Sequence, residues 1–465
     1  MAEKREVVVV GAGPAGYAAA FMAADKGKKV TIIDPEKNPG GVCLYRGCIP
    51  TKALLHAVKT KHEAALAADW GMIFGEPEVD LDKLRSWKES VVQKLTKGLG
   101  SLSKRRKIEH IHGMARFKDD RTLVAATDEG ESEITAESII LATGARAQIL
   151  PMMPDDDRVW TAESALDLPS IPKRLLVVGG GYIGLEMSYT YQGLGSKVDI
   201  VEMTDGLMPG ADRDLVKVFT DANESKYNRI MLSTLVDSVE QQKKGLEVSF
   251  KGDGAPDGPE TYDAILLATG RKPILDTLDL DKTDVELDED GFVKIDHQLR
   301  TTSENTYAVG DVAGSPMLAH KGLHEGRIAG SVVAGDTAAA IDTEAIPAVE
   351  YTDPEIAWVG LSETDAKKEG REIEVARFPW QASGRALTMG RSHGLTKLVV
   401  EKGTERVIGV GIAGAHAGEL IPEGVLALEM AATVRDIELT IHPHPTLSET
   451  IRGAAERFFG AATDV

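Results

Sequence analysis

The sequence of 465 residues predicts an α/β protein with two Rossmann-like units and a third, α+β domain at the carboxyl end. Three observations lead to this fold class. A strand, glycine loop, helix and strand follow one another near the start, the same pattern returns in the middle, and alternating strands begin beyond Pro347. A chain of this length exceeds what one hydrophobic core organises, so several domains are expected.

The first copy of the pattern starts with the valine run 7–10, which is typical of a buried strand. It continues through GAGPAG, with Gly11, Gly13 and Gly16, into an alanine-rich helix and a second strand that ends in Asp34. Glycines at this spacing let the backbone approach a pyrophosphate at the helix N-terminus, and the acid accepts hydrogen bonds from ribose hydroxyls. The first copy therefore predicts a dinucleotide site.

The second copy reads RLLVVGGGYIGLEMSYTYQGLGSKVDIVE and contains Gly179, Gly181, Gly184 and, at the end of its second strand, Glu202. In both copies the acid comes 23 residues after the first glycine. One glycine motif alone is weak evidence, but two copies in the same context predict that the protein binds two dinucleotides.

Each copy is followed by a hydrophobic strand with the same ending. SIILATGAR carries Thr143 and Gly144, and DAILLATGRKP carries Gly270 and Arg271. We expect these strands to return each sheet to its nucleotide, and a strand-to-turn ending without that role is the alternative for either copy alone.

The position of these strands indicates that the second unit is inserted between two parts of the first. A further strand-like segment, NTYAVGDVAG, ends in Gly310 and Asp311 and precedes a long predicted helix. The predicted segments are residues 1–148 and 149–270 for the two units, 271–346 for the part that completes the first unit, and 347–465 for the last domain.

The two cysteines of the chain, Cys43 and Cys48, both lie in GGVCLYRGCIPTKALLH. Pro50 suits the first residue of a helix, which puts Cys48 at or just before the helix N-terminus, where amides and the dipole stabilise a thiolate. Lys52 follows Cys48 by four residues and points to the same side. The pair predicts a redox-active disulfide. Two buried thiols or a stapled turn are the alternative, and a zinc site would need histidines to complete it.

Composition excludes several classes of function. The chain has 53 Lys and Arg against 73 Asp and Glu, a net charge of -20 that repels nucleic acid and anionic membranes. No apolar run is long enough for a membrane span, and glycines interrupt the N-terminal apolar run before an export signal could form. Two cysteines are too few for a secreted disulfide scaffold. A cytoplasmic protein is predicted.

Taken together, these segments resemble the flavin-dependent pyridine nucleotide-disulfide oxidoreductases. GAGPAG with Asp34, the cysteine segment, GGGYIGLE, ATGR, YAVGDV and HPHPTLSE stand in the family's order over almost the full chain. The resemblance implies FAD in the first site, with Gly310 and Asp311 at the flavin's ribityl chain, and NAD or NADP in the second. It also implies that Lys52 and Glu186 pair beside the flavin's hydride-exchanging nitrogen. Asp34 stands where the family more often has Glu.

The choice between NAD and NADP depends on Glu202. The residues that follow, MTDGLMPGAD, contain no Arg or Lys to bind a 2′-phosphate. A carboxylate accepts hydrogen bonds from two ribose hydroxyls and repels a phosphate, so the sequence favours NAD.

The segment HPHPTLSET is the family's second group of catalytic residues. In the family, the histidine before this proline, here His444, reaches the partner subunit's cysteines, and the following acid, here Glu449, orients its ring. A dithiol needs such a base because it is a poor nucleophile until deprotonated. The resemblance therefore implies a homodimer and a dimerisation role for the last domain. A metal site or a packed histidine is the alternative for this segment, and His442 is expected to be structural.

Within the family, the cysteine segment, LAHKGLHEGRIAG and HPHPTLSE look like those of members that oxidise dihydrolipoyl groups on 2-oxo acid dehydrogenase complexes or the glycine cleavage system. Such members pass hydride to NAD. The extra carboxy-terminal cysteine centre of mercuric and large thioredoxin reductases is absent from the sequence, and no lipoyl domain is expected ahead of the first strand. Tyr45 and Arg46 replace the commoner Asn-Val, and Tyr182 resembles the nicotinamide gate of glutathione reductases. An NAD(P)H-dependent reductase of another small disulfide stays open, as does a flavoprotein with a structural or docking role.

Overall fold

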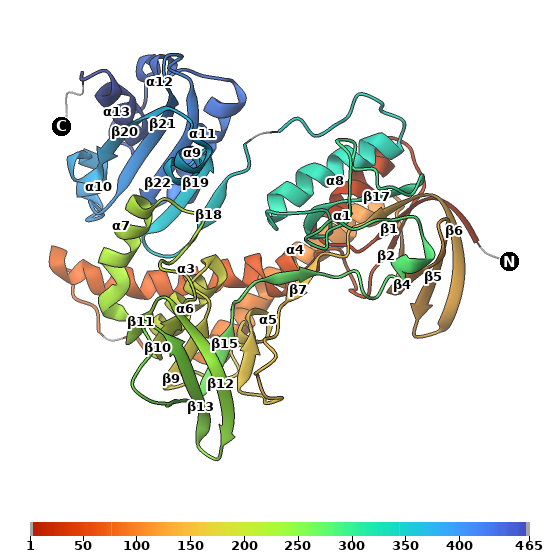
Figure 1. The fold of residues 1–465 in the computed structure, drawn as a ribbon, viewed down its shortest axis with the longest axis horizontal. Helices are drawn as coiled ribbons and strands as arrows, with labels where there is room; N and C mark the ends of the chain where they lie inside the picture. The colour runs from red at the N-terminus through yellow and green to blue at the C-terminus, as the bar shows by residue number, and fades with distance from the viewer. Residues whose placement is uncertain (1–2, 76, 344, 462–465) are drawn as a thin grey trace.

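The computed structural model describes residues 3–75, 77–343 and 345–461. Three large sheets occupy three parts of the molecule, coloured red to orange, yellow to green, and blue along the chain (Figure 1). The long helix that follows the cysteines extends from the first of these parts across the second, where it contacts helix α6, residues Tyr182–Leu194 (Figure 1). The fold class is the one that the sequence predicted: two α/β units and a third domain with an antiparallel sheet.

The first sheet is built around β1 (Glu3–Val10), which pairs in parallel with β2 (Val30–Ile33) and β6 (Gly130–Leu141). Residues 7–10 are buried, as expected for an apolar strand inside a parallel sheet covered by helices. β17 (Thr306–Ala308) pairs in parallel with β6, so a strand from beyond the second unit joins this sheet. Its other strands are β3 (Glu109–Ile111), β4 (Gly113–Asp119) and β5 (Thr122–Thr127).

Two helices from distant parts of the sequence pack closely against each other beside this sheet. They are α1 (Pro14–Asp25) and α8 (Ala319–Val333). A Cβ atom at Gly326 would lie 2.2 Å from the Ala15 carbonyl oxygen, so a larger residue would force the helices apart.

The second sheet is parallel and centred on β9 (Arg174–Val178), which lies between β10 (Lys197–Val201) and β15 (Ala264–Leu267). Helix α6 (Tyr182–Leu194) connects β9 to β10. This unit also contains β8 (Val159–Thr161), β11 (Arg229–Met231), the antiparallel strands β12 (Thr234–Gln242), β13 (Gly245–Gly252) and β14 (Glu260–Tyr262), and the helices α5 (Ala162–Ala165) and α7 (Arg213–Asn223).

The chain passes between the two units through a two-stranded ribbon. β7 (Ala145–Ala147) leads out of the first sheet, β16 (Arg271–Pro273) follows the second, and the two pair antiparallel. Both predicted ATG endings therefore lie next to this ribbon. The helices between the units' sheets are α2 (Gly41–Arg46), α3 (Cys48–Leu66) and α4 (Leu81–Arg105).

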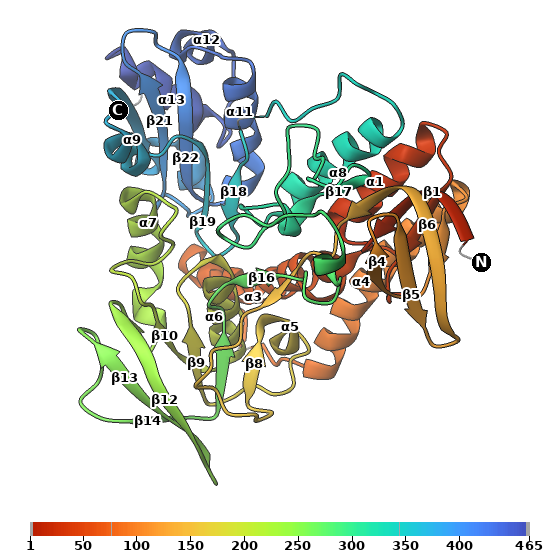
Figure 2. The same ribbon diagram turned by 45° about the vertical axis from the view of Figure 1, so that its right-hand side comes forward.

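The third domain has an antiparallel sheet in the order β18-β19-β22-β21-β20. Trp380, Ile412 and Leu398 are fully buried in its core. Figure 2 shows α7 of the second unit directly below this domain, and α7 contacts β19 and β22. The elements are β18 (Ala348–Glu350), β19 (Glu355–Gly360), β20 (Ile373–Pro379), β21 (Leu395–Glu401), β22 (Val407–Gly414), α9 (Glu363–Glu369), α10 (Gly384–Thr388), α11 (Ala417–Glu429), α12 (Val434–Leu439) and α13 (Glu449–Phe458).

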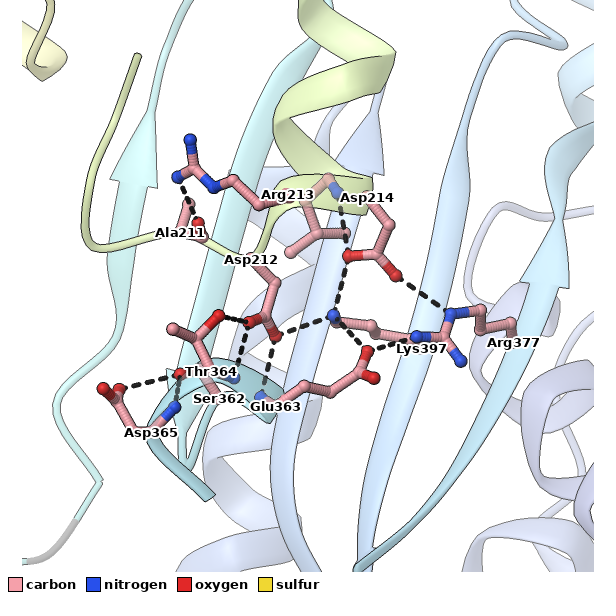
Figure 3. Close-up of polar contacts among 11 residues, drawn as sticks. Ala211, Asp212, Arg213, Asp214, Ser362, Glu363, Thr364, Asp365, Arg377 and Lys397 are labelled. Carbon is pink, nitrogen blue, oxygen red and sulfur yellow. Dashed lines mark hydrogen bonds and ion pairs between the residues drawn. The ribbon is translucent and has the colours of Figure 1, made fainter. Parts of the chain in front are cut away.

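A buried ion cluster joins the second unit to the third domain. Lys397 on β21 is 1% exposed, and its Nζ lies 2.7 Å from a carboxylate oxygen of each of Asp212, Asp214 and Glu363 (Figure 3). The guanidinium of Arg377 pairs with Asp214 at 2.9 Å and also with Glu363. Three carboxylates this close could hold a metal ion, but the Lys397 ammonium lies among them and balances their charge.

Candidate active site

The first glycine loop brings backbone atoms too close together for side chains. A Cβ atom at Gly11, whose φ is +100°, would lie 2.3 Å from the Ala142 carbonyl oxygen. At Gly16 it would lie 2.0 Å from the Gly11 carbonyl oxygen. The first turn of α1 is therefore held tightly against the ends of β1 and β6, with its amides free of side-chain bulk.

The second glycine loop has the same construction. A Cβ atom at Gly179 would lie 2.4 Å from the Ala268 carbonyl oxygen, and one at Gly184 would lie 2.0 Å from the Gly179 carbonyl oxygen. The loop opens α6, whose N-terminal cap is Gly181. The structure thus contains two geometrically matched cradles of the kind that accept a pyrophosphate.

The two acids at the ends of the second strands also match. Asp34 Oδ2 accepts a hydrogen bond from the Ala12 amide at 2.7 Å, and Glu202 Oε2 accepts one from the Gly180 amide at 2.7 Å. The second oxygen of each acid accepts from the amide two residues further on, at 2.8 Å. Burial raises the pKa of Asp34. Each acid therefore holds its own glycine loop in place through hydrogen bonds. The sequence had predicted only contacts of these acids with ribose, although the shared spacing of 23 residues also indicates the contact with the loop.

The first cation after Glu202 is turned away from it. The Arg213 guanidinium donates hydrogen bonds to the Leu207 carbonyl oxygen at 2.7 Å and to the Met208 carbonyl oxygen at 2.6 Å. Its donors are therefore engaged with backbone carbonyl oxygens.

The cysteines lie on two consecutive helices. Cys43 is on α2, and Cys48 is the first residue of α3, so the helix begins two residues before Pro50, which had been expected to open it. Pro50 fits as the third residue because an amide in the first turn has no partner within the helix. Both cysteines are free thiols and partly buried.

The two thiols have opposite acidities. A hydrogen bond from Cys43 lowers the pKa of Cys48 to about 7, and the nearby Lys52 ammonium acts in the same direction. The same hydrogen bond, together with burial, raises the pKa of Cys43. In the reduced pair, Cys48 is therefore the thiolate and Cys43 the thiol that donates to it.

Lys52 is one turn along α3 from Cys48 and makes a partly buried ion pair with Glu186 on α6. Its Nζ lies 2.7 Å and 2.9 Å from the two Glu186 carboxylate oxygens, and Glu186 is 3% exposed. Burial opposes the charge on Lys52, but Glu186 outweighs burial and raises the pKa of Lys52. The Tyr351 ring lies 4.5 Å from Nζ, and the Tyr351 amide donates to Glu186 Oε1 at 3.3 Å.

The segment at the end of β17 is held by a buried acid on α8. The Gly310 amide donates to Glu325 Oε2 at 2.7 Å, and Lys321 pairs with Glu325 at 2.7 Å. Burial raises the pKa of the neighbouring Asp311, and Arg271 opposes this shift from 3.7 Å. Glu325 was not singled out in the sequence, where it reads as one more helical acid.

The ATG endings lie beside the β7–β16 ribbon, and Tyr182 begins the helix after the second glycine loop. Thr143 donates to the Ile274 carbonyl oxygen at 2.6 Å, next to Gly144, and Gly270 has a positive φ of +112°. Tyr182 is the first residue of α6 and is 42% exposed. Burial of its hydroxyl raises the pKa of Tyr182, and the charges of Arg271, Asp311 and Cys48 act on it as well.

In the third domain, His444 and Glu449 of the histidine segment form a pair of their own. His444 Nδ1 lies 3.0 Å from Glu449 Oε1, and the His444 side chain is 79% exposed. The Thr446 amide donates to the other Glu449 oxygen at 2.7 Å, and these hydrogen bonds outweigh burial and lower the pKa of Glu449. His442, by contrast, is buried and pairs with Glu423 at 2.6 Å.

Within residues 3–75, 77–343 and 345–461, no hydrogen bond or ion pair joins His444 to either cysteine. One chain therefore brings together Cys43, Cys48, Lys52 and Glu186, while His444 and Glu449 form a second, outward-facing group.

These features define a class of protein: a two-dinucleotide oxidoreductase whose paired cysteines lie between the nucleotide units. A model of the pyridine nucleotide-disulphide oxidoreductases matches residues 5–326, and a model of that family's dimerisation domain matches residues 346–455. The chain belongs to the pyridine nucleotide-disulphide oxidoreductase family. This family uses FAD and NAD, and the two glycine cradles with their acids fit both groups. The dimerisation domain supports a homodimer.

Two relatives are similar over their full length. The chain is 48% identical to a dihydrolipoyl dehydrogenase of Vibrio cholerae over 463 residues, which is 99% of this chain and 97% of that protein. It is 47% identical to a dihydrolipoyl dehydrogenase of Haemophilus influenzae over 464 residues, 99% of this chain and 96% of that protein.

Solved structures of two bacterial proteins share the fold. LpdA of Mycobacterium tuberculosis has a TM-score of 0.90 at 27% identity and covers 98% of this chain and 99% of its own. The Cu(II) complex of RclA, a flavoprotein disulfide reductase of Escherichia coli, has a TM-score of 0.87 at 26% identity, with 98% and 99% covered. In the described parts of this chain, no helix is both long and apolar enough to cross a membrane.

Proposed function

We propose that this protein is a dihydrolipoyl dehydrogenase, which oxidises protein-bound dihydrolipoamide through Cys43 and Cys48 and passes hydride to NAD. The observation that carries the proposal is the position of Cys48 at the start of α3, one turn from Lys52, which pairs with Glu186 at 2.7 Å. A relative at 48% identity over 99% of the chain with this activity in its name supports the same function.

The substrate enters through thiol exchange. His444 of the partner subunit accepts a proton from one substrate thiol, and the resulting thiolate attacks Cys43 of the oxidised disulfide, so that Cys48 leaves as a thiolate. The second substrate thiol then gives up its proton to solvent, and its sulfur attacks the substrate sulfur of the mixed disulfide. Lipoamide is released as a disulfide, and Cys43 takes the proton held on His444.

Each remaining residue has a positioning or binding role. Glu449 holds the His444 ring through Nδ1, which leaves Nε2 to exchange protons. The Lys52 ammonium, held in place by its ion pair with Glu186, stabilises negative charge at Cys48. A bound FAD would supply the two-electron redox chemistry that links the cysteine pair to NAD. Its proposed contacts are Gly11, Gly13, Gly16, Asp34, Thr143, Gly144, Gly310 and Asp311, and those of NAD are Gly179, Gly181, Tyr182, Gly184, Glu202, Gly270 and Arg271.

Two properties outside the active site complete the proposal. We propose that the protein works in the cytoplasm, as its cysteine content suggests. Its partners would be the lipoyl domains or core subunit of a 2-oxo acid dehydrogenase complex, or the glycine cleavage system.

The test is turnover of dihydrolipoamide with NAD by the wild type and by Cys48→Ser. The wild type should reduce NAD, and C48S should retain bound FAD but lose activity because the thiolate that leaves from Cys43 is missing. Near-normal turnover by C48S, or no turnover by the wild type, would overturn the proposal.

A second candidate, an NAD(P)H-dependent reductase of another small disulfide, is favoured by Tyr182. This ring lies at the opening of the second nucleotide unit, within the electrostatic reach of Cys48. Glutathione disulfide and other small disulfides, assayed with NADH and NADPH, decide between the two candidates. If the protein reduces one of these small disulfides faster than it oxidises dihydrolipoamide, the reductase is the favoured candidate.

A further inference from the structure

Glu350, the last residue of β18, is a buried acid that the proposed mechanism does not use. It is 0% exposed, and neither of its carboxylate oxygens has a hydrogen-bond partner within the described ranges 3–75, 77–343 and 345–461. Because this chain alone buries the side chain completely, it contacts neither solvent nor any surface that a partner could cover. Burying an ionised carboxylate without a hydrogen-bond partner is strongly unfavourable, and binding a proton removes its charge.

The strand delivers Glu350 to the Lys52–Glu186 pair. Glu350 is opposite Ile356 of β19 in the antiparallel ladder, and Ile356 is fully buried. The next residue, Tyr351, donates its amide to Glu186 and places its ring 4.5 Å from Lys52 Nζ. The end of β18 is therefore built against the ion pair that neighbours Cys48.

Several titratable groups surround this carboxyl. Lys52 comes from α3, Glu186 from α6, and the buried Tyr227 hydroxyl from the segment before β11. Burial and the nearby Glu350 raise the pKa of Tyr227. On the adjacent strand, β19, Glu355 is already paired with Lys59 at 3.6 Å. Lys52 is thus the cation that acts on Glu350, and it is shared with Glu186.

These surroundings favour the protonated acid. Burial and the Glu186 charge raise the pKa of Glu350 well above its usual range, and Lys52 offsets this only in part. With Glu350 neutral, the group formed by Lys52 and Glu186 has no net charge, so Lys52 stays available to a thiolate at Cys48.

We propose that Glu350 is a proton-bearing positioning residue that acts through Lys52 and Glu186 on Cys48: it must hold its proton for the Cys48 thiolate to be stabilised, and its ionisation makes the disulfide harder to reduce. The coupling is reciprocal. A thiolate at Cys48 holds the proton on Glu350, and an ionised Glu350 destabilises the thiolate, because both charges are negative. This inference rests on the proposed redox role of the two cysteines.

Because of this coupling, Glu350 loses its proton at a lower pH in the oxidised enzyme than in the reduced enzyme. Between those two pH values, reduction of the disulfide takes up one additional proton. Two electrons still convert the disulfide to a thiol and a thiolate, with one proton going to Cys43, and the additional proton goes to Glu350. Each proton changes the slope of the midpoint potential by about 30 mV per pH unit for a two-electron couple.

The experiment compares the wild-type holoenzyme with Glu350→Gln from about pH 5 to about pH 10, a range that spans the ordinary acid and thiol pKa values. The enzyme is equilibrated in dithiothreitol redox buffers, and free Cys43 and Cys48 are counted by alkylation. We expect the two midpoint potentials to run parallel at low pH and to separate at high pH, with the wild type becoming the more negative. Glu374→Gln, which removes an exposed acid of β20, should follow the wild type throughout.

A constant difference between wild type and E350Q at every pH would show a structural effect and overturn the proposal, and so would superimposable curves. Glu350→Leu removes the polar group altogether and must separate from the wild type at high pH in the same way as E350Q; it also serves if E350Q does not fold. Urea unfolding at the same pH values gives a second readout: the wild type should lose stability relative to E350Q as pH rises above about 4.3, the ordinary pKa of Glu.

Failure of the proposed function has a different signature. Dihydrolipoamide turnover by the wild type is measured in parallel, and its absence would overturn the substrate assignment. The potential measurements need only the two cysteines and Glu350, so they decide the role of Glu350 in either case.

Discussion

Replacing Lys397 with Met tests whether the buried ion cluster holds the second unit to the third domain. The substitution keeps the length of the side chain and removes the ammonium that lies 2.7 Å from three carboxylates. Breaking a buried ion pair by removing one partner costs about 3–5 kcal/mol.

For Lys397→Met, the structure indicates a loss of stability at the lower end of the range of about 3–5 kcal/mol. Asp214 and Glu363 have side chains that are 30% and 31% exposed, and Arg377 remains to pair with both. Asp212, which is 6% exposed, loses its cation and keeps hydrogen bonds from the Glu363 and Thr364 amides at 3.0 Å and 3.1 Å and from the Thr364 hydroxyl at 2.8 Å. One uncompensated buried carboxylate corresponds to about 3 kcal/mol.

Urea unfolding at neutral pH measures this loss. The matched control is Lys402→Met, which removes a cation from the residue after β21 whose side chain is 55% exposed and 3.3 Å from Glu372; it should cost less than about 1 kcal/mol. Equal effects of K397M and K402M would refute the reasoning, because burial would then have no consequence.

The pH dependence gives an independent check. Although burial opposes it, Lys397 lowers the pKa of both Asp212 and Asp214. A lowered pKa stabilises the folded state above the unfolded value, about 3.9, and this contribution is lost as pH falls through the folded value. The wild type should therefore lose more stability than K397M as the pH drops below about 4.

Three further predictions concern the active site. Alkylation of Cys48 in the reduced wild type should rise through about pH 7, and in Cys43→Ser its midpoint should move up toward about 8.5; an unchanged midpoint would show that the Cys43 hydrogen bond does not lower it. His444→Gln should lower the rate of dihydrolipoamide oxidation by about 10²- to 10⁴-fold while NADH still reduces the flavin, and equal loss in both measurements would argue against a base specific to the dithiol. Gly16→Ala should lose FAD, measured as the flavin-to-protein absorbance ratio, because its Cβ would lie 2.0 Å from a carbonyl oxygen of its own loop. Gly258→Ala, which meets nothing within 4 Å, is the control and should retain FAD.

Much of the fold was predictable because its signals are local. The two glycine loops, the strands beside them and the acids at the same spacing depend on short-range backbone geometry, which a linear sequence records directly. The predicted fold class, family, and FAD and NAD are confirmed, whereas the segment boundaries and the roles of the site residues stay predictions. The start of α3 was misplaced by two residues, since Pro50 fits anywhere in a first turn.

The sequence by itself determined the nucleotide loops, the cysteine pair and its position at a helix N-terminus. Only the tertiary structure decided which charges meet: Glu186 reaches Lys52 across 134 positions of sequence, and Lys397 gathers acids from two different units. The same holds for Glu350, which in the sequence is one acid among many and in the structure is buried beside that pair. The physical reason is that a carboxyl group's proton affinity depends on its distance from solvent and from other charges, and those distances exist only once the chain has folded.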